Sequence, residues 1–146
     1  MNDRRQRAVG LAAKGYRLGL LALSLPIILG EFFDSDTGAA YGVDLPTKLL
    51  LVARMARNNL RIPTGSSFVE HLVIATKALG IPAEQEGCLV ECGAYKGGST
   101  ANLSLVAALC GRELVVFDSF EGMPEPEAAD REHVLIASEQ RHTYET

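Results

Sequence analysis

The residues best suited to chemistry lie in the stretch VECGAYKGGST, residues 90–100. Glu91 precedes a turn that contains Gly93, Gly97 and Gly98. Glycines allow the backbone to adopt left-handed conformations and to approach a ligand closely. The stretch therefore predicts a ligand-binding turn, and its charges should indicate which ligand it binds.

The turn matches the dinucleotide fingerprint GxGxxG only in part. Gly93 and Gly98 take the first and third glycine positions, but Tyr95 takes the middle one. The middle glycine normally lets the backbone approach a pyrophosphate, so Tyr95 argues against close phosphate contact. The carboxylate of Glu91 would also repel a pyrophosphate at close range. An NAD(P)-binding oxidoreductase is therefore the second hypothesis.

The same charges favour a ligand with an ammonium or sulfonium group near Glu91. The carboxylate of that ligand could lie at the start of a helix that opens at Gly98 and Ser99, where the helix dipole favours an anion. Asp118, 20 residues beyond Gly98, could hydrogen-bond a ribose. S-adenosylmethionine has all of these groups and no phosphate, so we expect it rather than NAD.

Two strands are needed to bring the turn and Asp118 together. Residues 88–92 (CLVEC) and 113–117 (ELVVF) are short apolar runs, and a helix over residues 98–110, ended by Gly111, separates them. This pattern predicts a βαβ unit whose parallel strands bind ligands beyond their carboxyl ends. The expected inner face of the helix comprises Ala101, Leu105, Ala108 and Leu109.

Two further helices are expected before the first strand. Asp44 is placed to cap one of them, with Pro46 in its first turn. Ser67 and Glu70 form a capping box at the start of the other, which Gly80 ends. Their expected apolar stripes are Leu49, Val52, Met55 and Ala56, and Phe68, Leu72, Ala75 and Leu79.

The N-terminal region combines a basic start with an apolar run. Residues 18–30 are 13 uncharged residues, fewer than the roughly 20 that cross a bilayer. Pro26 is expected to kink or end a helix there, and residues 31–44, rich in Gly, Asp and Ser, indicate a loop. A buried or interfacial helix, a signal or anchor and a partner-binding segment all stay open. The basic residues before the run are Arg4, Arg5, Arg7, Lys14 and Arg17.

The composition fits a globular domain of 146 residues with a net charge of −4, which argues against nucleic-acid binding. The 3 cysteines form no CxxC pair, so we expect no zinc site, and buried thiols in the reducing cytoplasm are the default. The acidic residues 121–130 form no recognisable metal set. The catalytic base is unknown, because each histidine fits an ordinary surface or helix position better than a catalytic one: His71, His133 and His142.

The segments LVECGAYKGGST and VVFDSFEGMPEP closely resemble the macrocin O-methyltransferase (TylF-like) family of class I S-adenosylmethionine-dependent methyltransferases. The resemblance covers roughly residues 64–127. It implies an α/β, Rossmann-like class I methyltransferase fold. It also implies O-methylation of a small-molecule acceptor, such as a sugar or natural-product hydroxyl.

Site residues follow from the resemblance position by position. Asp118 and Ser119 would hold the ribose, and Phe120 would lie near the adenine. The alternative for the glycines is that they only permit helix–strand packing, and the side chain of Lys96 fits a solvated position equally well. The implied contacts with the rest of the cofactor come from Glu91, Gly93, Tyr95, Lys96, Gly97, Gly98 and Ser99.

Relatives in this family are similar to other class I enzymes in having a seven-stranded sheet, whereas only two strands are convincing here. We therefore expect an incomplete fold that is inactive alone: an N-terminal segment and loop (1–44), a helical lead-in (45–86) and the truncated start of the cofactor domain (87–146). Mg²⁺ would belong only to a full-length form. An open sheet edge favours a homo-oligomer. The third hypothesis is a non-enzymatic fragment that binds a partner or touches a membrane through residues 18–33.

Overall fold

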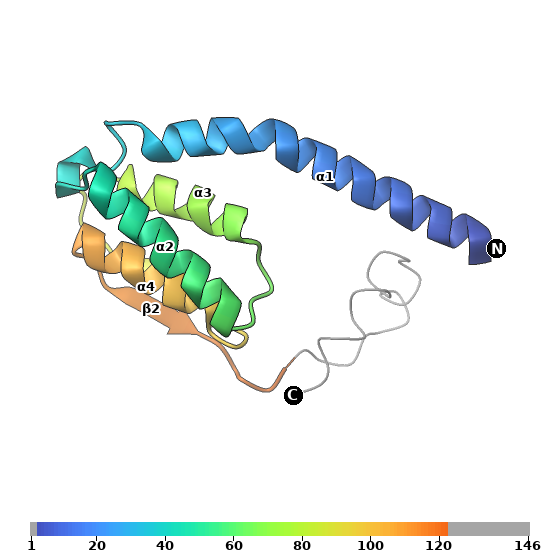
Figure 1. Cartoon of the computed structure of the whole chain (residues 1–146). Coiled ribbons are helices and arrows are strands. Elements are labelled where there is room, and N and C mark those ends of the chain that lie inside the picture. The colour runs from blue at the N-terminus through green and yellow to red at the C-terminus, as the bar shows by residue number, and fades with distance from the viewer. Residues whose placement is uncertain (1–2, 123–146) are drawn as a thin grey trace.

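The computed structural model describes residues 3–122, without the side chains of 3–14, 17, 18 and 21. The described elements follow one another along the chain, with helices before and between the strands (Figure 1). They are α1 (Asp3–Phe33), the 3-10 helix η1 (Ala39–Tyr41), α2 (Leu45–Arg61), α3 (Phe68–Leu79), β1 (Leu89–Cys92), α4 (Gly98–Cys110) and β2 (Leu114–Phe117).

The two strands pair in parallel and α4 connects them, which confirms the predicted βαβ unit and an α/β architecture. The register places Leu89 opposite Leu114 and Cys92 opposite Phe117. Each strand begins one residue later than predicted. The backbone N–H of Gly93 donates to the carbonyl of Phe117 at 2.8 Å, so the pairing continues to the carboxyl end of both strands.

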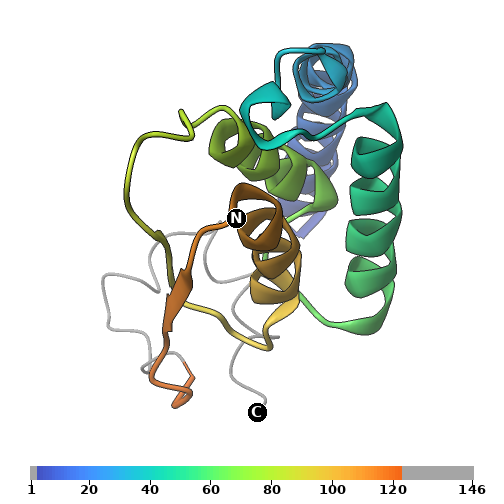
Figure 2. The same ribbon diagram turned by 90° about the vertical axis from the view of Figure 1, so that its left-hand side faces the viewer.

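The hydrophobic core lies among the helices, which gather on one side of the strand pair (Figures 1 and 2). Helix α4 contacts β2, α2 and α3, and α3 also contacts α1. The fully buried apolar side chains come from all four α-helices, so burial of one shared core holds them together. The largest of these side chains are Phe32, Met55, Leu72, Leu79 and Val106.

The structure confirms the capping residues that the sequence predicts for three helices. The carboxylate of Asp44 accepts the backbone N–H of Thr47 at 3.0 Å and so caps α2. Ser67 and Glu70 form both halves of the capping box on α3. Gly111 ends α4 in a left-handed conformation, at φ 62°.

Two of the predicted apolar stripes are wrong in detail. Helix α2 buries Leu51 and Met55, whereas Leu49 is 54% exposed. Helix α4 bears out its predicted stripe only in part: Leu105 and Leu109 pack against the core, but Ala108 is exposed. The fully buried face lies beside the predicted one and includes a polar residue. The spacing of apolar residues could not identify it, because Asn102 counts as a surface residue in such a pattern. The side chains that α4 buries are Asn102, Val106, Ala107 and Cys110.

The N-terminal region is helical for longer than predicted. Helix α1 continues through Pro26 to Phe33, and residues 39–41 form η1, so residues 31–44 are only partly a loop. Proline removes one backbone donor from a helix but does not always break it. The α1 ribbon extends well beyond the other helices toward the N-terminus (Figure 1). Among the described residues, no helix is both long and apolar enough to cross a membrane.

The cysteines differ from the expected buried thiols. Cys88 and Cys92 are exposed, and only Cys110 is buried. Burial raises the pKa of the Cys110 thiol. The prediction was wrong for Cys88, which directly precedes β1, and for Cys92 at its end, because this side of the strand, which also carries the exposed Val90, has no described element over it.

Candidate active site

The turn between β1 and α4 adopts the left-handed backbone that its glycines predicted. Gly93 has φ 90° and Gly97 has φ 81°, and an added Cβ atom at either would meet nothing within 4 Å. Tyr95 also has a positive φ, 53°, which costs an L-residue about 1–2 kcal/mol. The positive φ angles therefore define the shape of the turn, and its backbone at both glycines is open to a ligand.

Gly98 serves a different purpose, as the first residue of α4. An added Cβ atom there would lie 2.7 Å from the carbonyl oxygen of Pro63 and 2.7 Å from Cβ of Thr64. Both contacts belong to the loop before α3. The packing role that we kept open for the glycines thus applies to Gly98, although its neighbour is a loop and not a strand.

Asp118 ties the end of β2 to the turn after β1. One carboxylate oxygen accepts the backbone N–H groups of Ala94 at 2.5 Å and Tyr95 at 2.9 Å. The other oxygen accepts the N–H of Phe120 at 2.7 Å. The backbone donors of Phe120, Tyr95 and Ala94 lower the pKa of Asp118, so the group is ionised at neutral pH. The oxygen with one donor retains capacity for another hydrogen bond.

Glu91 points toward the start of α4 and is only 8% exposed. Its two carboxylate oxygens accept hydrogen bonds from the hydroxyls of Ser99 at 2.5 Å and Thr100 at 2.6 Å. A carboxylate at a helix N-terminus is favoured by the helix dipole. Thr100 was not among the predicted site residues, although a hydroxyl in the first turn of the helix could have indicated it.

A cavity of about 350 Å³ lies beside Glu91 at the carboxyl end of β1. Residues of α3, β1 and α4 line it together with Ser66, so both apolar and polar groups face it. Three predicted site residues line this cavity and are brought together by the fold. They are Glu91, Gly93 and Ser99.

Four other predicted residues do not line this cavity: Tyr95, Lys96, Ser119 and Phe120. The ammonium of Lys96 stands 5.5 Å from the ring centroid of Tyr95, which is 44% exposed. Phe120 is 74% exposed, and the hydroxyl of Ser119 accepts the N–H of Glu121 at 3.3 Å. None of these side chains lines the cavity, so the predicted residues form two groups joined by the turn and Asp118.

A buried polar network beneath the cavity was not predicted. His71 is 1% exposed, and its Nε2 lies 2.6 Å from the hydroxyl of Ser66, which lines the cavity. Its Nδ1 lies 2.8 Å from the amide of Asn102, which also donates to Asn59 and accepts from Asn58. These contacts join α2, α3 and α4.

His71 is therefore an ordinary helix histidine, one of the two non-catalytic positions that the sequence favoured, and it is buried rather than on the surface. Burial lowers its pKa, while the carboxylates of Glu70 and Glu91 raise it to a smaller extent. In the assigned amide orientations Asn102 donates to Nδ1, so the neutral ring carries its proton on Nε2 and donates to Ser66. His71 lies one residue before Leu72 and four residues before Ala75, on the same inner side of α3, and this spacing could have indicated its burial.

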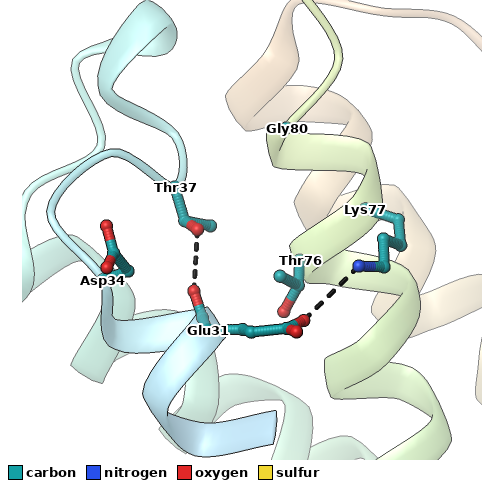
Figure 3. A pocket seen from close by; sticks show the side chains of 6 residues that line it. All are labelled: Glu31, Asp34, Thr37, Thr76, Lys77 and Gly80. Atoms are coloured by element: carbon teal, nitrogen blue, oxygen red, sulfur yellow. Dashed lines mark hydrogen bonds and ion pairs between the residues drawn. The ribbon is translucent and has the colours of Figure 1, made fainter. Parts of the chain in front are cut away.

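A second cavity, of about 410 Å³, lies apart from the turn (Figure 3). It is larger, but its polar groups mostly bond to the protein. The ammonium of Lys77 lies 3.4 Å from the carboxylate of Glu31, and the hydroxyl of Thr37 donates to the carbonyl of Glu31. The hydroxyl of Thr76 donates to its own helix. We therefore place the candidate site at the turn.

Within residues 3–122, no group of three His, Cys, Asp or Glu side chains could hold a metal ion. Several residues weighed in the sequence lie outside the described part of the chain. They are Glu125, Glu127, Asp130, His133 and His142.

Comparison with known proteins gives one match. The family model of the macrocin-O-methyltransferases (TylF) matches residues 64–145, more than half of the chain. This range contains α3, both strands, α4 and therefore the whole glycine turn. No curated protein matches, and no solved structure matches either. The chain belongs to the macrocin-O-methyltransferase (TylF) family.

Proposed function

We propose that the chain binds S-adenosylmethionine at the turn after β1, within a Rossmann-like class I methyltransferase fold. The proposed reaction is O-methylation of a small molecule, such as a sugar or natural-product hydroxyl. The observation that carries the proposal is the pair of carboxylates, Glu91 and Asp118, on either side of a glycine turn whose backbone is open at Gly93 and Gly97. Family membership supports the same reaction class.

The charges of the site support a cationic, phosphate-free cofactor. Glu91 lies on the cavity wall, and Asp118 is held ionised by backbone donors. An ammonium or sulfonium group is attracted by these carboxylates, whereas a pyrophosphate would be repelled. NAD(P) remains the alternative ligand, and the carboxylates disfavour it.

Each part of the site has a proposed role. The first backbone N–H groups of α4 bind the cofactor carboxylate, since helix N-termini favour anions. Asp118 accepts a hydrogen bond from a ribose hydroxyl through the oxygen that has one donor in this structure. Phe120 is exposed and free to cover the adenine. When bound, S-adenosylmethionine supplies an electrophilic methyl group, and the protein supplies its position.

The catalytic base remains unassigned. Both ring nitrogens of His71 already have partners inside the protein, and its ring is 1% exposed. A general base must reach the proton that it abstracts, directly or through one water. We therefore assign His71 to support of the cavity wall through Ser66.

The test is a binding measurement on the full chain with S-adenosylhomocysteine, comparing wild type with Asp118→Asn. The variant keeps the size of the side chain but loses its charge, so we expect the affinity to fall about tenfold or more through a weaker charge-assisted hydrogen bond. Asp36→Asn is the matched control, because Asp36 is an exposed carboxylate in the turn after α1.

The proposal fails if Asp118→Asn binds as tightly as wild type. A thermal melt of each variant shows whether the fold is intact. Adenosine has the ribose of the cofactor but lacks its amino-acid part. Titrations of wild type and Asp118→Asn with adenosine alone therefore separate loss of the ribose contact from the effect of Asp118 on the turn.

A further inference from the structure

Helix α1 has an apolar face that no described part of the protein covers. Tyr16, Leu20, Leu23 and Ile27 are 69%, 49%, 75% and 65% exposed. Large apolar side chains gathered on one face usually mark an interaction surface. We call these four residues the α1 seam.

The spacing of the α1 seam is that of a coiled coil. Its members are separated by four, three and four residues, which matches the a and d positions of a heptad repeat. Val9 and Ala13 continue the same spacing toward the N-terminus in the sequence. From Val9 to Ile27 the pattern covers 18 steps, or about 27 Å at 1.5 Å per residue.

The seam is separate from the face by which α1 joins its own domain. Phe32 is fully buried, and Ile28, Leu29 and Phe33 pack against the core. At 3.6 residues per turn, these residues centre on the side of the helix roughly opposite to the α1 seam. A helix can therefore dock on the seam without displacing α3.

We propose that a second copy of this chain covers the seam, with the two α1 helices antiparallel. In this register Tyr16 of one copy faces Ile27 of the other, and Leu20 faces Leu23. These contacts occur twice by symmetry and close a two-fold dimer. Large apolar side chains thus meet in four consecutive layers.

Charge favours this direction. The first 17 residues contain five basic residues and one acid, Asp3, so a parallel pair would bring two cationic ends together. In the antiparallel pair Arg17, which follows Tyr16, flanks the same side of the seam as Glu31 of the other copy, which follows Gly30. The carboxylate of Glu31 lies 3.4 Å from the ammonium of an exposed lysine, Lys77, and stays accessible (Figure 3).

The seam is short, so the dimer is concentration-dependent. Stable interfaces bury about 800 Å² on each partner, and a seam of this length with two small or medium residues at one end buries less. Weak specific interfaces have dissociation constants on the order of µM to several hundred µM. Sedimentation equilibrium of the full chain over about this concentration range therefore covers the monomer–dimer transition.

The first variant is Leu23→Glu, at the most exposed seam position. We expect it to remain monomeric over the whole concentration range. The matched control is Leu60→Glu on α2, because Leu60 is 88% exposed and outside the seam. We expect this control to dimerise like wild type, and an equal loss in both variants overturns the proposal.

A charge swap tests the direction. Arg17→Glu should weaken the dimer at low salt, and the double variant Arg17→Glu with Glu31→Arg should restore it. A dimer that the single swap does not weaken, or that the double swap does not restore, overturns the antiparallel arrangement. If the chain stays monomeric but sediments with vesicles containing 30% phosphatidylserine, the α1 seam binds a membrane, and the dimer proposal is overturned.

Discussion

Removal of one buried amide should show how strongly α4 depends on its polar contacts. The side chain of Asn102 is 1% exposed and joins three helices. Its amide contacts His71 and Asn59, and its carbonyl oxygen accepts from Asn58. The substitution Asn102→Ala removes these three hydrogen bonds and leaves their partners in place.

The expected cost follows from the burial of each partner. His71 is as buried as Asn102, so its ring nitrogen loses a partner without gaining water, at about 1–3 kcal/mol. Asn58 and Asn59 are half-buried and regain some hydration, so each loses only the net value of a hydrogen bond, about 0.5–1.5 kcal/mol. We expect the free energy of unfolding to fall by about 2–6 kcal/mol, a large part of a typical total.

Urea denaturation of the full chain, followed by far-ultraviolet circular dichroism, measures this change. Ser104→Ala is the matched control, because Ser104 is an exposed residue of the same helix whose hydroxyl donates to the carbonyl of Ala101, within that helix. A double variant with His71→Leu should lose less than the two single losses combined, since both partners are then apolar. An Asn102→Ala chain as stable as the control would refute the network.

The remaining predictions concern pH, packing and the core. Burial holds the pKa of His71 below its unfolded value, so stability is full above about pH 6.5 and falls at lower pH; His71→Gln should remove this slope in chemical denaturation between pH 5 and 6.5. Gly98→Ala should destabilise by about 1–3 kcal/mol, through its contacts with the loop before α3, and a wild-type melting temperature would contradict that packing. Met55→Ala should cost about 2–5 kcal/mol, whereas Leu49→Ala should be near neutral, and equal losses would restore the stripe that the sequence predicted.

The local elements could be predicted because their signals are local. A capping box needs only Ser67 and Glu70 three residues apart, and a left-handed helix end needs only Gly111. The parallel pairing of the two strands also follows from short apolar runs joined by a helix. These features depend on neighbours in the sequence, so they are visible without the fold.

The internal contacts of the site could not be predicted, because they depend on which residues the fold brings together. Asn102 is in a helix whose apolar spacing points to another face, and only α2 and α3 make its burial favourable. Asp118 was predicted to hold a ribose, and the structure adds three backbone donors that fix its position. Helix α1 likewise continues through Pro26 to Phe32, which is buried in the core, and the local sequence gives no sign of that burial.

The central claim concerns the ligand of the turn, and parallel calorimetric titrations of the full chain with S-adenosylhomocysteine and with NAD⁺ test it most directly. We expect S-adenosylhomocysteine to bind at one site and NAD⁺ to produce no saturable heat, because Glu91 and Asp118 favour a cation and repel a pyrophosphate. Tighter binding of NAD⁺, or no binding of S-adenosylhomocysteine, would contradict the account.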